Sequence, residues 1–174
     1  MPTAAPTPIP AWKITWFLRL YGLVYIPLVR FCWPSVIECS NQRTILRLPL
    51  RRATKNHLGA MYFGALNIGA ELCIAMVAVI KIRESGHRID FLFKDYKADF
   101  LRRAEDDVYF ICEEVETVVK QIAEASTSTE RINRTMRAYA IVPKVAPAAG
   151  ASLAGEEKIA TFELTLSVRQ RKPK

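Results

Sequence analysis

Two side chains able to do chemistry, Asn67 and Glu71, interrupt the otherwise apolar run from Leu58 to Ile80. A helix that is apolar on nearly every face has to be buried, either in protein or in lipid. An ionised carboxylate in such surroundings needs a partner or a task. Glu71 is therefore the first candidate for a catalytic residue. The alternative is a structural carboxylate that is hydrogen-bonded to Asn67 or to the backbone.

The residues before Glu71 have the spacing of a single helix face. Gly64, Asn67 and Glu71 are three and four positions apart, which places them within about 60° of one another. Free backbone N–H groups at a helix start, together with the helix dipole, suit an anion or a developing oxyanion. Gly59 and Gly64 allow a ligand to approach the backbone closely, although small residues also allow a helix to pack tightly on a sheet.

This helix start resembles the motif of hotdog-fold acyl-CoA thioesterases of the phenylacetyl-CoA thioesterase type. In that motif an asparagine–glycine loop leads into a His-Gly-Gly helix start, and an acid follows seven positions after the last glycine. Here Asn56 and Gly59 match the loop, Gly64 the last glycine and Glu71 the acid. The resemblance, which includes a thioesterase-like branch of the same superfamily, covers about Arg19 to Arg171.

The chain departs from the motif at Tyr62 and Phe63, which stand where many relatives have the histidine and the first glycine. The departure bears on substrate access and catalytic power rather than on the fold. It favours an alternative function, a non-catalytic hotdog protein that binds an acyl chain or lipid.

The resemblance implies a hydrolase acting on an acyl-CoA or acyl-carrier thioester. Backbone amides near Phe63 and Gly64 would bind the thioester carbonyl oxygen, a role worth about 3 kcal/mol per donor. Glu71 would activate water or attack directly, and Asn56 or Asn67 would orient the water or the carbonyl. Coenzyme A enters only as part of the substrate, and no metal is implied. The substrate-binding candidates are Gly59, Tyr62 and Phe63, with Arg51, Arg52 and Lys55 for the coenzyme A phosphates.

Gly64 and Glu71 are about 10 Å apart along one helix, which is far for a single reaction centre. The resemblance implies a solution, a homodimer or a dimer of dimers in which the acid meets the helix start of the facing subunit.

The remaining pattern predicts an α+β fold, an antiparallel β-sheet wrapped around a long central helix with an N-terminal helical extension. Residues 43–51 alternate as a strand does, with Pro49 suggesting an edge position or a bulge. Further strands are expected over residues 90–103, 108–113, 133–144 and 160–171, and a surface helix over 114–125. We expect a disordered lead-in (1–11), an amphipathic helical segment lying across the domain or on a membrane surface (12–40), a hotdog domain (41–171) and a basic tail (172–174).

Composition narrows the classes of function. The net charge of +8 favours anionic partners such as a phosphorylated cofactor or an acidic membrane surface, but no nucleic-acid recognition motif accompanies it. The four cysteines lack metal-ligand spacing and indicate a thiol-reduced, cytoplasmic setting. A membrane protein with spans Ile14–Pro34 and Leu58–Ile80 is an alternative, although Glu71 near mid-span would cost at least about 2.5 kcal/mol.

Overall fold

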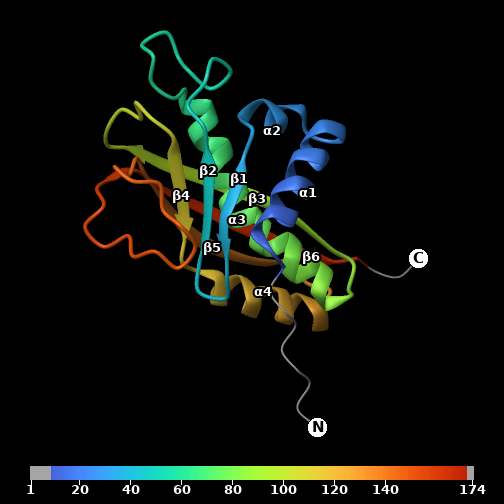
Figure 1. The fold of residues 1–174 in the computed structure, drawn as a ribbon. Helices are drawn as coiled ribbons and strands as arrows, with labels where there is room; N and C mark the ends of the chain where they lie inside the picture. The colour runs from blue at the N-terminus through green and yellow to red at the C-terminus, as the bar shows by residue number, and fades with distance from the viewer. Residues whose placement is uncertain (1–8, 172–174) are drawn as a thin grey trace.

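A six-stranded antiparallel sheet wraps around one long helix in the computed structural model of the protein, which describes residues 9–171 (Figure 1). The α+β architecture predicted from the sequence is therefore confirmed. Most of the expected lead-in and all of the expected basic tail lie outside the described residues. The strands are β1 (Ser35–Cys39), β2 (Thr44–Leu48), β3 (Ile89–Phe100), β4 (Val108–Cys112), β5 (Ile132–Ile141) and β6 (Lys158–Gln170), in the spatial order β1-β2-β4-β5-β6-β3.

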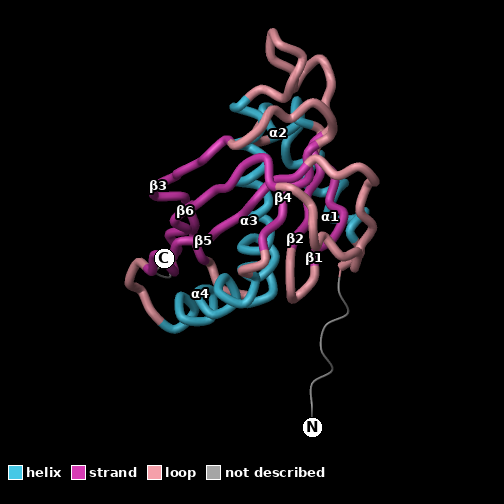
Figure 2. The backbone as a smooth tube through the Cα atoms, turned by 90° about the vertical axis from the view of Figure 1, so that its left-hand side faces the viewer, coloured by secondary structure: helices cyan, strands magenta, loops and turns pink. Residues whose placement is uncertain are grey.

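Four helices accompany the sheet in this part of the chain. The central helix α3 (Phe63–Ser85) packs against β2, β4 and β5, and α4 (Val115–Thr127) lies beside it over β5 and β6 (Figure 2). The helices α1 (Ala11–Val24) and α2 (Pro27–Cys32) pack against each other, and α1 also packs against the edge strand β1. The two edges of the sheet are thus different, since β1 carries the helical extension and β3 is paired only with β6.

The last strand, β6, follows the alternation of its sequence only in part, because Thr165 and Ser167, at positions expected to face outward, are also buried. Phe162, Leu164, Leu166 and Val168 of β6 are fully buried, as their inward-facing positions predict. The expected surface helix is α4, but it carries a fully buried residue, Gln121, whose amide donates to carbonyl oxygens of β5 and β6. That side chain ties α4 to the sheet.

Two local predictions are wrong. The segment expected to be helical up to residue 40 contains β1, which pairs with β2 from Ser35 to Cys39. Pro49 follows β2 instead of lying within it, and β2 is an interior strand between β1 and β4, so Pro49 marks neither an edge nor a bulge. Strand pairing, which a local pattern does not contain, decides both cases.

The sequence predicts that the sheet buries α3 on all sides, and this prediction is wrong. Most of the helix is buried, but Phe63 and Glu71 are exposed and Asn67 is half-buried along one stripe. α3 is long and apolar enough to span a membrane, yet more than half of its most apolar stretch is buried within the protein. The other expected span is divided into α1 and α2, so the arrangement favours a core helix over a membrane-spanning one.

Gly69 sets how closely α3 approaches the sheet. A Cβ added at this position would come within 2.3 Å of the ring of Phe110, which is fully buried in β4. The ring is enclosed by core residues and has little room to move. The absence of a side chain at Gly69 therefore allows the helix and the strand to pack at this distance.

Gly69→Ala should destabilise the protein by about 1–3 kcal/mol because its Cβ would overpack a closed core. Urea denaturation of the variant and the wild type measures the difference. Gly64→Ala is the matched control: its Cβ would meet the ring of Tyr62, which is half exposed and free to turn. The control should change stability by less than about 1 kcal/mol. Equal effects at the two glycines would contradict this account of α3 packing.

Candidate active site

The loop between β2 and α3 is closed by its own hydrogen bonds. The Thr54 hydroxyl donates to the carbonyl oxygen of Pro49 (2.8 Å) and accepts the Arg51 N–H (3.0 Å). The side-chain oxygen of Asn56 accepts the Leu58 N–H at 2.9 Å, an Asx turn in which Asn56 braces the loop. Gly59 has a φ of 82°, a left-handed conformation that glycine adopts without strain.

The start of α3 presents two free donors. Backbone N–H groups of Met61 and Tyr62 donate to the carbonyl oxygens of Ala104 (2.8 Å) and Thr54 (2.7 Å), which fixes the approach to the helix. Within residues 9–171 the next two N–H groups, those of Phe63 and Gly64, have no hydrogen-bond acceptor, and no side chain caps the helix. They have the character expected of an oxyanion-binding site.

Aromatic side chains crowd this helix start. The Tyr62 ring lies over the Cα of Gly64, since a Cβ there would be 2.5 Å from the ring. The rings of Tyr62 and Phe63 meet edge-on at 4.9 Å, and Phe63 meets Phe100 of β3 at 6.4 Å. Tyr62 and Phe63, both predicted to bind substrate, thus form a half-exposed aromatic wall beside the free N–H groups.

Glu71 stands without a polar partner. Among the described residues it has neither a hydrogen bond nor an ion pair, so the alternative of a structural carboxylate bonded to Asn67 is not what the structure contains. Its carboxylate is reached by solvent, but the surrounding protein removes part of its hydration and raises its pKa above the ordinary value. A carboxylate with a raised pKa and no competing partner suits a general base.

Asn67 is held by a residue that sequence reasoning missed. The hydroxyl of Tyr96, on β3, donates to the Asn67 side-chain oxygen at 2.7 Å. Burial and the nearby Glu71 carboxylate both raise the pKa of Tyr96, so it stays a neutral donor at physiological pH. The pairing of β3 with β6 shifts register between Phe93 and Tyr96. This irregularity re-aims the strand, and nothing in the local alternation would have placed Tyr96 beside α3.

The three predicted cations are not equivalent. Arg51 donates to the carbonyl oxygen of Phe31 in α2 (2.7 Å) and stacks on the Trp33 ring (5.3 Å), so its side chain is committed to the helical extension. Arg52 and Lys55 are exposed and form no ion pair within the described chain. Only the latter two have their charges available to a phosphate.

The site is therefore in two parts on one uncovered stripe of α3. One part is the pair of free N–H groups of Phe63 and Gly64, and the other is Glu71 with Asn67 and Tyr96. About two helical turns, roughly 10 Å, separate Gly64 from Glu71. A single chain does not bring the two parts to one reacting atom.

An antiparallel sheet that wraps around a long central helix defines a hotdog fold. Residues 16–134 match the family model described as "Domain of unknown function (DUF4442)", and the chain belongs to this family. No curated protein matches it in sequence.

Solved structures show the same fold over nearly the whole chain. The protein is similar to PA5026 of Pseudomonas aeruginosa, described as a probable thioesterase, with a TM-score of 0.70 and 18% identity over 96% of this chain and 100% of that one. It is similar to OLEI01261 of Chlorobaculum tepidum, described as having unknown function, with a TM-score of 0.76 and 11% identity over 92% and 97% of the two chains. Thioesterase PA1618 of P. aeruginosa, in a mutant form, gives a TM-score of 0.64 and 12% identity over 95% and 98%.

Glu71→Gln should stabilise the fold at neutral pH. The folded state raises the pKa of this carboxyl, so it binds the proton more tightly than the unfolded state does. Wild type and variant should be equally stable below pH about 4, where the carboxyl is protonated in both states. As the pH rises through the folded-state pKa, the wild type should lose stability relative to the variant. Urea denaturation from pH about 4 to about 8 measures this divergence.

Glu116→Gln provides a control of opposite sign. Lys120 lowers the pKa of the exposed Glu116 carboxyl, so ionisation there favours the folded state. This variant should lose stability relative to the wild type as the pH rises. A wild type that is more stable than Glu71→Gln at pH about 8 would contradict the described environment of Glu71.

Proposed function

We propose that the protein is a thioesterase that hydrolyses acyl-CoA or acyl-carrier thioesters. The observation that carries this proposal is the open stripe of α3, which combines an unpartnered carboxylate of raised pKa with two free N–H groups at the start of the same helix. A base and an oxyanion-binding site are the two requirements of thioester hydrolysis by water.

In the proposed reaction the oxygen of a water molecule attacks the thioester carbonyl carbon while Glu71 takes the water proton. The Phe63 and Gly64 N–H groups stabilise the negative charge that develops on the carbonyl oxygen. The C–S bond then breaks, and the protonated Glu71 returns its proton to the leaving thiolate. Tyr96 engages the side-chain oxygen of Asn67, which leaves the Asn67 amide N–H₂ to orient the attacking water.

Two protomers complete the proposed site. The edge strand β3 is twelve residues long, and its Leu92, Tyr96 and Phe100 expose 39–49% of their surface. A long edge of this kind is suited to pairing with another strand. Pairing two β3 strands would continue the sheet and turn the open stripes of two α3 helices toward each other. Glu71 of one protomer would then face the helix start of its partner, a contact that a single chain does not provide.

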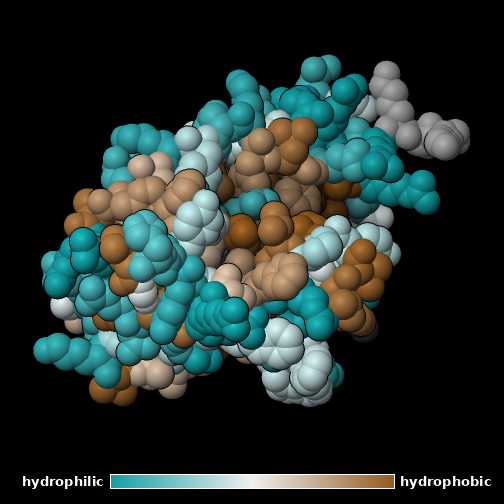
Figure 3. Space-filling model, turned by 90° about the horizontal axis from the view of Figure 1, so that it is seen from above, coloured by the Kyte–Doolittle hydropathy of each residue, from teal (hydrophilic) through white to brown (hydrophobic). Residues whose placement is uncertain are grey.

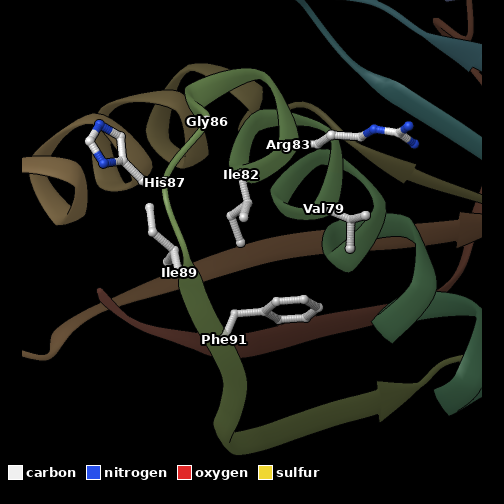
Figure 4. Close-up of a pocket in the computed structure, with 7 residues that line it drawn as sticks. All are labelled: Val79, Ile82, Arg83, Gly86, His87, Ile89 and Phe91. Carbon is white, nitrogen blue, oxygen red and sulfur yellow. The ribbon is translucent and has the colours of Figure 1, made fainter. Parts of the chain in front are cut away.

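A groove at the far end of α3 is the proposed site for the acyl chain. It has a volume of about 390 Å³ and lies between the C-terminal half of the helix and the beginning of β3 (Figure 4). Val79 and Ile82 project into it from α3, and Ile89 and Phe91 from the strand, whereas Arg83 and His87 point away from its apolar centre. Val79 and Ile82 lie within about 80° of Glu71 on the helix, so the groove continues the stripe that bears the carboxylate.

A second candidate function is binding of an acyl thioester without hydrolysis. The Tyr62 ring covers Gly64 at the place where a substrate carbonyl would approach the free N–H groups. If the ring stayed there in the assembled protein, an acyl chain could bind while its carbonyl remained out of reach. Tyr62→His combined with Phe63→Gly would remove this cover and should raise hydrolysis in that case.

Acyl-CoA substrates of graded chain length test hydrolysis directly. Glu71→Gln should lower kcat/KM at least about 100-fold because the general base is lost. Glu84→Gln is the matched control, since Glu84 lies on the same helix and is exposed. It should leave the rate unchanged. A wild-type rate in Glu71→Gln would overturn the mechanism, and binding of acyl-CoA by a wild type that hydrolyses none of the panel would establish the second candidate.

Mixing two inactive variants tests whether the site is shared. Gly64→Pro removes a free N–H without removing a helix hydrogen bond, and proline is tolerated in the first helical turn. Each variant alone should be inactive, but a heterodimer of Gly64→Pro and Glu71→Gln protomers contains one intact site of two. Since about half of the dimers in an equal mixture are heterodimers, activity should return to about a quarter of the wild-type value. Absence of any recovery after subunit exchange would place both parts of the site within one protomer.

A further inference from the structure

The helical extension presents an apolar face that nothing in the described chain covers. This α1–α2 face includes the following side chains, each of which exposes 50–64% of its surface: Trp12, Trp16, Leu20, Leu23, Leu28 and Phe31. In α1 they follow one helix stripe, at spacings of four, four and three residues. Hydrophobic atoms also gather on the side of the molecule that is seen from above, around a hollow with hydrophilic atoms at its border (Figure 3). An apolar patch of this extent marks an interaction site.

The opposite side of α1 packs against the rest of the protein. Ile14 and Leu18 are buried, and the Thr15 hydroxyl accepts the Val36 N–H of β1 at 2.9 Å. Gly22 allows α2 to pack closely against α1, since a Cβ at this position would lie 3.0 Å from the backbone nitrogen of Arg30. The orientation of α1 is therefore fixed by contacts on its inner side, and the outer stripe is presented outward as part of a rigid unit.

The charge around this face has one sign. Residues 9–62 contain eight lysines and arginines, but Glu38 is their only acidic residue. Glu38 is already paired with Arg43 at 2.9 Å. Arg47 is likewise paired, with Asp107. The cations that are exposed in this part of the chain include Lys13, Arg30, Arg52 and Lys55. The exposed cations are therefore the charge that an occupant of this part of the surface would meet, and an occupant that is apolar beneath an anionic surface would match both features.

We propose that the α1–α2 face binds the surface of a membrane that contains anionic phospholipids. Tryptophan and tyrosine favour the boundary between headgroups and acyl chains, and each basic residue near an anionic bilayer adds to the attraction. A second copy of the chain fits the face poorly, because face-to-face association would bring two sets of like charges together. The proposal is independent of thioester hydrolysis.

Tryptophan fluorescence reports on the helical extension that carries this face. The three tryptophans of the chain, Trp12, Trp16 and Trp33, all lie in the helical extension and are all exposed. Full-length protein is titrated with vesicles of phosphatidylcholine, either pure or with phosphatidylserine. The emission should shift to shorter wavelength with the anionic vesicles, and the affinity for pure phosphatidylcholine should be at least about 10-fold weaker. No spectral shift with anionic vesicles would overturn the proposal.

Pairs of variants test whether vesicle binding depends on the α1–α2 face rather than on the rest of the protein surface. Leu20→Ser with Leu23→Ser keeps all three tryptophans and should weaken vesicle binding at least about 30-fold. Val119→Ser with Val145→Ser, which alters two exposed apolar residues elsewhere, should bind as the wild type does. Lys13→Gln with Arg30→Gln should weaken binding more than Lys120→Gln with Lys144→Gln, although the net charge falls equally.

Self-association is the competing outcome. If Leu20→Ser with Leu23→Ser converted a dimer to a monomer in size-exclusion chromatography and left vesicle binding unchanged, the face would be an interface between copies of the chain and the proposal would be overturned. Unchanged oligomeric state with lost vesicle binding supports it.

Discussion

The close contact between Gly69 of α3 and the Phe110 ring of β4 determines which side of the central helix faces the sheet. Two positions along a helix correspond to a rotation of about 200°. Asn67 and Glu71 each lie two positions from Gly69, so both point away from the sheet when Gly69 faces it. The packing that stabilises the fold therefore also exposes the polar residues of the candidate site.

This orientation explains why an apolar helix carries an isolated carboxylate. Glu71 is not a buried charge that the core must accommodate, because solvent still reaches it. Its raised pKa comes from reduced hydration rather than from a neighbouring carboxylate. Tyr96 occupies the oxygen of Asn67, so Glu71 keeps its own hydrogen-bonding capacity for a ligand. A polar network and a free carboxylate coexist on the same stripe.

The length of the apolar run from Leu58 to Ile80 predicted the central helix, and periodicity predicted the later strands and the inward-facing residues of β6. Burial of Thr165 and Ser167 on the other face of β6 was not predicted. The helix start and Glu71 could be proposed from motif spacing. Tyr96 could not, because a register shift within β3 brings it to Asn67. The open stripe of α3 could not be predicted either, because it depends on how far the sheet curls around the helix. The curl is set by pairing between strands that are distant in the sequence. The predicted catalytic roles remain predictions.

Arg51 connects two regions that the sequence places far apart. Its side chain donates to Phe31 of α2, and its own N–H donates to Thr54, whose carbonyl oxygen accepts the N–H of Tyr62. These hydrogen bonds form a continuous chain from the helical extension to Tyr62, the residue that precedes α3. A displacement of α2 would therefore act on the residues that precede the candidate oxyanion donors unless one of these three hydrogen bonds broke.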